Sequence, residues 1–489
     1  MKRKLTIGFL VSILLFSCLH ARAEVDFNRE LYRQLSEDVI NEQPEIEIPE
    51  YRSTTLENGI RLFMLKDDEL PYLKIMGYIK GGKVLEEGEL AGITDFMVNM
   101  MNTGTENYGE KELNKYKERH AVDFSLGSGS HQLYFSGDAL TTEQEELLSL
   151  AREVLLRPRF DASYHQRLIN ERERSLMQAK TRQENLASMY FYRNIYSDHP
   201  YSYGADIDRL LDTLQNYNPD NLATHYRRLF VPEDTVIMVY GDFSYQAMET
   251  AISDRFGDWT GGEEASSGSP EVEINKENFG RTILVDKPDA TQAKIVMGYN
   301  LKIDDFAERV KFNLADEVFG SGNFTCRLFE NLRDEKGYVY NVSSNYSDRE
   351  LGGTYVVETS VRPDKARETT ELIRDEIEMI VSGEEEITGE EIYNIVNKKN
   401  AFFPEDYRYK EDVFESEVYN IELEDREPGY LNRYVQTYNQ ATAAEINEVF
   451  KKYIAPEKFL TVIVGKKEDV LPAFEEEGIE VEVKETGKD

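Results

Sequence analysis

One segment in the first quarter of the chain has the spacing of a metal site. Between Gly92 and Thr105, a helix would place Asp95 and Asn99 one turn apart, so that both side chains could reach one metal ion. The carboxylate of Asp95 could bind a metal, whereas the neutral amide of Asn99 is a poor zinc ligand. Val98 lies between them and has no group that accepts a proton. A metal held here would therefore lack the general base that activates its bound water.

A second segment, residues 320–342, carries two hydrogen-bond donors. Its Gly-rich turn leads to Arg327, and Tyr340 follows at the other end. A guanidinium and a phenol hydroxyl can both donate to a carbonyl oxygen that gains negative charge. The alternative is structural: Arg327 pairs with one of the many carboxylates, and Tyr340 packs in a strand.

The other candidate ligands are scattered. Beyond position 23 the His residues form no pair at i, i+3 or i+4; they are His120, His131, His165, His199 and His225. The two cysteines are Cys18 and Cys326, and Cys326 stands alone if Cys18 is removed with a signal peptide. Neither a disulfide within the chain nor a Cys-based metal site is then expected.

The segment from Gly92 to Thr105 resembles the zinc-binding helix of the M16 (insulinase-like, pitrilysin-like) metallopeptidases. In that family the helix carries His-x-x-Glu-His. Here Asp95 stands at the first His, Val98 at the Glu and Asn99 at the second His. The flanking residues also match; they are Gly81-Gly82-Lys83 before the helix and Gly104-Thr105 after it. These flanks favour the resemblance over the alternative, an ordinary amphipathic helix that never bound zinc.

The resemblance also implies two further assignments. The family's third zinc ligand is a Glu on a later helix, and here Gln178 or Ala179 falls at its place. Residues 320–342 are similar to the family's second-half motif, which gives Arg327 and Tyr340 the positions of a paired Arg and Tyr that help hold the substrate backbone. The resemblance thus implies a chain without its own metal that keeps a substrate-binding pair.

The chain also contains an internal repeat. A basic helix end, a Pro-Glu turn and an apolar run closing on Gly occur at residues 225–241 and again at residues 449–465. Both halves also begin alike, with opening strands predicted near Gly59 and Gly280. A Met-Gly-Tyr sequence follows each of them, at residues 76–78 and 297–299.

We therefore predict an α+β fold of two homologous halves, each with a largely antiparallel sheet packed against helices, as in M16 peptidases. The expected organisation is a signal peptide at 1–23, a loosely packed acidic arm at 24–50, a first domain at 51–260, a flexible linker at 261–278 and a second domain at 279–489. Helices are predicted at 141–156 and 366–380, and the acidic end from residue 475 is expected to fray.

Composition bounds the partners. The net charge of −36 repels phosphate backbones, so nucleic acid is not an expected partner. A basic, extended peptide is the expected ligand instead. Residues 1–23 combine a basic start, an apolar run and a cleavage site after Ala23, which predicts export to a periplasm or the exterior without a membrane span. A lipoprotein anchor at Cys18 is the alternative, which the bulk of Phe16 disfavours.

Two hypotheses for function follow. In the first, the chain is the non-catalytic subunit of a two-chain M16 peptidase: it holds no cofactor, and zinc belongs to a partner subunit. In the second, it is a stand-alone peptide-binding or scaffold protein derived from such a peptidase. The presence of both Arg327 and Tyr340 favours the first.

Overall fold

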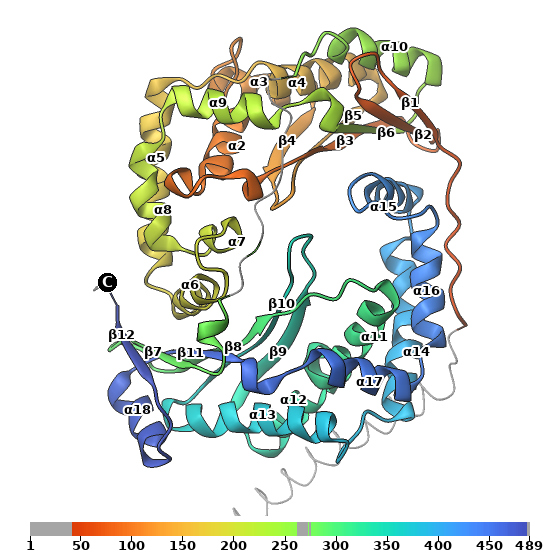
Figure 1. The fold of residues 1–489 in the computed structure, drawn as a ribbon. Helices are drawn as coiled ribbons and strands as arrows, with labels where there is room; N and C mark the ends of the chain where they lie inside the picture. The colour runs from red at the N-terminus through yellow and green to blue at the C-terminus, as the bar shows by residue number, and fades with distance from the viewer. Residues whose placement is uncertain (1–41, 262–271, 273–274, 487–489) are drawn as a thin grey trace, which may run out of the picture.

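The computed structural model describes residues 42–261, 272 and 275–486. The predicted signal peptide at 1–23, most of the arm and most of the linker lie outside these residues. The described chain folds into two halves, each built on a six-stranded sheet with helices packed against it (Figure 1). The predicted fold class is confirmed.

The two sheets share the order of five strands and differ in one edge strand, which is β1 in the first half and β12 in the second. In the first half the order is β1-β2-β6-β3-β5-β4, and in the second it is β12-β7-β11-β8-β10-β9. The strands of the first sheet are β1 Arg52–Thr55, β2 Arg61–Lys66, β3 Tyr72–Lys80, β4 Asp123–Ser128, β5 Gln132–Leu140 and β6 Thr235–Gly241. Those of the second are β7 Thr282–Asp286, β8 Ala293–Asn300, β9 Val339–Ser347, β10 Thr354–Val361, β11 Leu460–Gly465 and β12 Glu482–Glu485.

The strand directions repeat as well. The β2–β6 and β7–β11 pairs are parallel, and the three pairs from β6 to β4 and from β11 to β9 are antiparallel in both sheets. Only the edge pairs differ, since β1–β2 is antiparallel and β7–β12 is parallel. The Met-Gly-Tyr sequences lie in β3 and β8. A Cβ on Gly77 would lie 2.1 Å from the Val236 carbonyl oxygen, and one on Gly298 would lie 2.0 Å from that of Tyr355. Both sheets therefore need glycine where a neighbouring strand passes closely.

Helices cover both sheets. Those of the first half are α2 Ile93–Thr103, α3 Glu110–His120, α4 Gln144–Leu156, α5 Ala162–Ala179, α6 Gln183–Tyr196, α7 Pro200–Tyr203, α8 Ile207–Thr213, α9 Pro219–Leu229 and α10 Tyr245–Phe256. Those of the second are α11 Phe306–Asp316, α12 Arg327–Phe329, α13 Ala366–Ser382, α14 Gly389–Asp406, α15 Lys410–Glu422, α16 Tyr430–Gln440, α17 Ala443–Tyr453 and α18 Lys467–Glu476. The helices predicted at 141–156 and 366–380 are confirmed as α4 and α13.

Each half covers part of the other half's sheet. Helix α15, from the second half, packs against β2 and β6 of the first sheet (Figure 1). Its Phe414 and Val418 are fully buried in a cluster with Phe63, Met76 and other apolar residues of the first half. The Tyr78 hydroxyl donates to Glu415 Oε1 at 2.9 Å beside this cluster.

The converse contact is made by α6, which packs against β8 and β11 of the second sheet (Figure 1). Gln183 donates to the Val464 carbonyl at 3.0 Å, and the buried Tyr196 hydroxyl donates to the Gly352 carbonyl at 3.2 Å. The two halves defined by the internal repeat therefore do not have separate hydrophobic cores, since each contributes one helix that packs on the sheet of the other.

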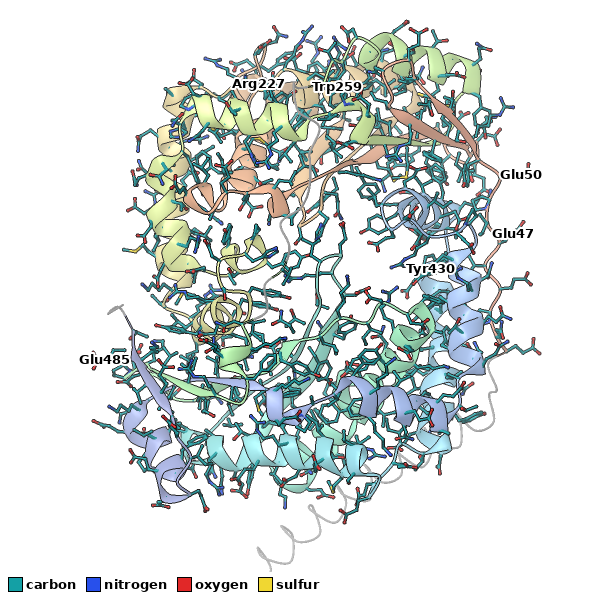
Figure 2. All side chains as sticks on the ribbon, in the orientation of Figure 1. Glu47, Glu50, Arg227, Trp259, Tyr430 and Glu485 are labelled. Atoms are coloured by element: carbon teal, nitrogen blue, oxygen red, sulfur yellow. The ribbon has the colours of Figure 1, made fainter. Side chains whose placement is uncertain are left out.

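Both ends of the described chain are more ordered than expected. The end of the arm runs along the outside of the molecule past Glu47 and Glu50 (Figure 2). The amide and carbonyl of Ile46 hydrogen bond with the Asn432 side chain at 2.8 Å each, and the Ile46 side chain is buried. At the other end, β12 pairs in parallel with β7. The expectations of a loose arm and a fraying end are therefore wrong for residues 42–50 and 475–486.

Candidate functional site

The helix with the spacing of a zinc motif is α2, as predicted, and its three key side chains point to different environments. The Asp95 carboxylate forms an ion pair with Lys83 Nζ at 2.8 Å and accepts a hydrogen bond from Ser128 Oγ at 2.5 Å. Val98 is buried in the core. Asn99 is exposed to solvent. The only carboxylate of the motif is thus already engaged by a cation.

These residues do not fit a zinc ion. A metal at Asp95 would compete with the Lys83 ammonium, and neither Val98 nor Asn99 adds an ionised ligand. On α5, Gln178 is exposed and Ala179 is half-buried, and neither supplies a carboxylate. Within the described residues, no three His, Cys, Asp or Glu side chains are placed to hold a metal together.

Buried polar contacts fix the start of α2. The Glu86 carboxylate accepts from the backbone amides of Gly92 at 2.7 Å and Thr94 at 3.0 Å. Burial raises the pKa of Glu86 to about 7. The Thr94 hydroxyl hydrogen bonds with His225 Nε2 at 2.9 Å, and burial lowers the pKa of His225 to about 4. A neutral imidazole thus lies behind this helix at neutral pH, as a structural group.

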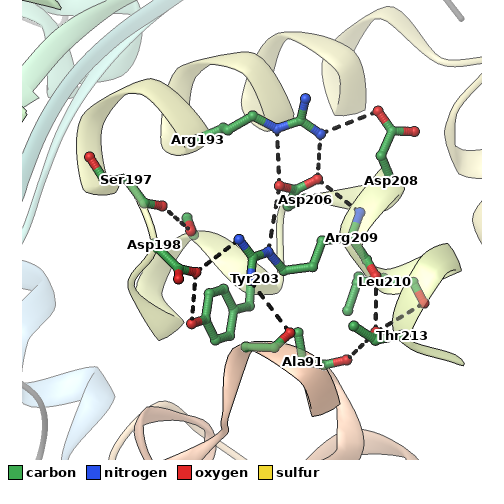
Figure 3. A network of polar contacts seen from close by, with 12 residues as sticks. Ala91, Arg193, Ser197, Asp198, Tyr203, Asp206, Asp208, Arg209, Leu210 and Thr213 are labelled. Carbon is green, nitrogen blue, oxygen red and sulfur yellow. Dashed lines mark hydrogen bonds and ion pairs between the residues drawn. The ribbon is translucent and has the colours of Figure 1, made fainter. Parts of the chain in front are cut away.

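A polar network links α6, α7 and α8 to the segment that leads into α2 (Figure 3). Arg193 donates to Asp206 through Nε at 3.0 Å and through Nη2 at 2.5 Å. Arg209 contacts Asp198 at 2.8 Å, and the Thr213 hydroxyl donates to the Ala91 carbonyl at 2.9 Å. These contacts hold α2 in a fixed position relative to α6, which itself packs on the second sheet.

Arg327 is engaged by the protein. Its Nε and Nη2 donate to the two carboxylate oxygens of Glu391 at 2.7 and 2.9 Å. Its Nη1 and Nη2 also donate to the carbonyls of Glu385 at 2.9 Å and Glu386 at 3.0 Å. Burial raises the pKa of Glu391, but the hydrogen bonds from Arg327 and Thr388 outweigh it, and the net pKa is lowered. This is the structural alternative stated for Arg327: it anchors the first turn of α14.

Tyr340 is instead accompanied by Arg333, a residue that sequence analysis passed over. The Tyr340 side chain is 81% exposed, and the guanidinium carbon of Arg333 lies 4.9 Å from its ring centroid. Arg333 also lies over Phe329 at 4.8 Å and faces Phe324, which is exposed. Arg333 lies in the helical turn Glu330–Glu335, shortly before β9, the strand that carries Tyr340, and no sequence signal distinguishes it from Arg327.

Two cavities are lined in part by the segment that leads into α2. One, of about 480 Å³, is bordered by α5, α6, α7 and α8. The other, of about 770 Å³, is lined by both halves and includes the β9–β10 loop and the segment after α15. They share Val84, Ser130 and Arg349 in their linings. Both volumes are typical of small-molecule or peptide side-chain sites.

Known families match both halves of this arrangement. Residues 71–205 match the family described as Insulinase (Peptidase family M16), and residues 216–399 match the one described as Peptidase M16 inactive domain. Together the two matches cover more than half of the chain, which belongs to the M16 peptidase family.

Its relatives include proteins named as zinc proteases. The chain is 22% identical to the uncharacterized zinc protease YmxG of Bacillus subtilis over 70% of this chain and 80% of that protein. It is 20% identical to the zinc protease PqqE of Helicobacter pylori, over 59% of this chain and 65% of that protein.

Solved structures share the fold. An M16 inactive domain from Pseudomonas fluorescens superposes with a TM-score of 0.75 at 17% identity, covering 85% of this chain and 98% of that one. The periplasmic protease PqqL of Escherichia coli gives 0.72 at 15% identity, covering 87% of this chain and 47% of that one. Among the described residues, no helix has the length and apolar character needed to cross a bilayer.

Proposed function

We propose that this chain is the non-catalytic subunit of an M16-type peptidase, which binds peptide and completes the chamber of a zinc-bearing partner. The proposal rests on one observation at α2. Asp95, at the position where the resemblance places a zinc ligand, forms an ion pair with Lys83. Because α2 offers neither a second ionised ligand nor a general base, the catalytic metal must come from another chain.

The substrate-facing part of the proposal rests on Tyr340 and Arg333. Their side chains lie together, and that of Tyr340 is exposed, so its hydroxyl is free to meet a ligand. We assign to Arg333 the role that sequence analysis gave to Arg327, because the donors of Arg327 are used by Glu391 and two backbone carbonyls. The alternative function, a stand-alone peptide-binding or scaffold protein, gives no reason to keep this exposed pair.

The proposal places the mature chain outside the cytoplasm, after removal of residues 1–23. The sequence of those residues supports export, and so does the likeness to a protein named as periplasmic. Lipid attachment at Cys18 remains the alternative.

Mixing experiments test the function. We expect the purified chain to cleave no fluorogenic peptide, and its mixture with an M16 subunit that has an intact His-x-x-Glu-His to cleave peptides that neither cleaves alone. Light scattering should show the two chains in one complex. The matched control is the same mixture with both zinc-ligand His residues of the partner replaced by Ala, which should be inactive. Cleavage by this chain alone, or a mixture no more active than the partner, would overturn the proposal.

A further inference from the structure

The cavity of about 480 Å³ has an unusual charge for this protein. Three of its lining side chains are cationic, namely Lys83, Arg172 and Arg349, and no Asp or Glu is among its described lining residues. The whole chain carries a net charge of −36. A cavity of about 480 Å³ whose charged lining residues are all cationic is therefore a local exception that needs a reason.

Two of these cations have no carboxylate partner. Arg172, on α5, is half-buried and forms no hydrogen bond or ion pair with any other described residue. Arg349, on the β9–β10 loop, forms no ion pair with a described residue either, and its guanidinium lies over the ring of Tyr201 at 4.8 Å. Stacking uses the face of a guanidinium and leaves the N–H groups at its edge free to bind an anion.

The third cation is partly neutralised. Lys83 pairs with Asp95 at 2.8 Å, and Asp95 is itself held by Ser128. Both carboxylates next to Arg349 in sequence pair elsewhere: Asp348 with Arg309 at 2.6 Å, and Glu350 with His131 Nδ1 at 3.0 Å. Two arginines without a carboxylate partner among the described residues thus remain, one from each half of the molecule, in a cavity that Lys83 also lines.

We propose that this cavity binds a carboxylate of the peptide, either an acidic side chain or the free C-terminus. This deepens the proposed function, on which it rests, by naming the substrate class: peptides with a carboxylate that reaches Arg172 and Arg349. The sequence-based preference for basic peptides came from net charge, whereas the lining of this cavity has the opposite sign. Two guanidinium groups with open edges favour a planar carboxylate held by paired N–H donors.

Binding of matched peptides tests this directly. Four fluorescein-labelled decapeptides of one apolar sequence would carry Glu or Gln at the centre, each with a free or an amidated C-terminus, and their binding to the mature chain would be followed by fluorescence polarisation. We expect loss of the recognised carboxylate to raise Kd by about tenfold, the effect of one charge-assisted hydrogen-bonded pair. The pair of peptides that shows the difference tells a side-chain carboxylate from a C-terminal one.

Variants locate the effect. In Arg172→Gln the difference between the acid and neutral peptides should fall below about twofold, and Arg172→Lys should restore part of it. The matched control is Arg174→Gln, an exposed arginine on the same helix outside the cavity, which should keep the full difference. Equal melting temperatures would show that the variants fold.

The outcomes separate the two claims. If peptides bind but acid and neutral forms bind equally to the unmodified chain, the carboxylate site is wrong and peptide binding stands. If no peptide binds, both fall. If Arg172→Gln and Arg174→Gln lose the difference equally, the effect is one of overall charge and the cavity is not the site. Inorganic phosphate that binds while no peptide carboxylate matters would also overturn the proposal.

Discussion

Replacing Arg333 by Ala should lower the turnover of the mixed enzyme by about a hundredfold or more, the usual cost of removing one donor to a developing oxyanion. The guanidinium lies 4.9 Å from the ring of the exposed Tyr340, so both groups can face one substrate carbonyl. Tyr340→Phe keeps the ring and removes only the hydroxyl, and we expect a loss of similar size. Turnover of a fluorogenic peptide at saturating concentration is the measurement.

Two further variants complete this test. Lys336→Ala removes an exposed cation from the same segment and should leave turnover unchanged. Arg327→Gln should lower the melting temperature instead, since it breaks the paired contact with Glu391. The contrary outcome is that Arg327→Gln lowers turnover without a change in melting temperature, while Arg333→Ala changes neither turnover nor melting temperature. Arg327 would then be the substrate-binding residue, and Arg333 would not.

Phe414→Ala should lower the free energy of unfolding by about 3–5 kcal/mol, as for other large aromatic side chains removed from a core. Its ring is fully buried between α15 and the first sheet, with Tyr51 at 5.5 Å between ring centroids. Because the contact joins the two halves, we expect a single unfolding transition that shifts as a whole in denaturant. The matched control, Phe402→Ala, removes a ring that is 61% exposed and should change stability by less than about 0.5 kcal/mol. Separate transitions, with only one of them shifted, would contradict the exchange of helices between the halves.

The sequence predicted most of the sheet framework. Short apolar runs that close on glycine and recur in both halves define β6 and β11, and the Met-Gly-Tyr sequences define β3 and β8. Such signals are local, since a strand's burial and a glycine's close approach act within a few residues.

The exchange of α6 and α15 could not be predicted in this way. Their apolar positions show that one face is buried, but the same pattern would serve against either sheet. The choice depends on surfaces that meet only in the folded chain, such as Phe414 against Phe63. The packing of residues 42–50 also could not be predicted, because Ile46 is buried against α15 and α16, which it meets only in the folded chain.

The candidate site was predicted in part. The helix and the three altered positions of the zinc motif can be read from sequence, and the structure adds that Asp95 is neutralised by Lys83. The choice between Arg327 and Arg333 cannot be read there, because both lie in one motif and have the same chemistry. Only the contacts with Glu391 and Tyr340 tell the two apart. The cationic cavity also needs the fold, since Arg172 and Arg349 come from different halves.

The zinc content of the purified mature chain tests the central claim most directly. After incubation with excess zinc and dialysis, elemental analysis should find no stoichiometric zinc, because Asp95 is paired with Lys83 and α2 offers no second ionised ligand. The Asp95→Ala variant should give the same value as the unmodified chain. One tightly bound zinc per chain that disappears in Asp95→Ala would contradict the account, because it would show that this chain holds its own metal at α2.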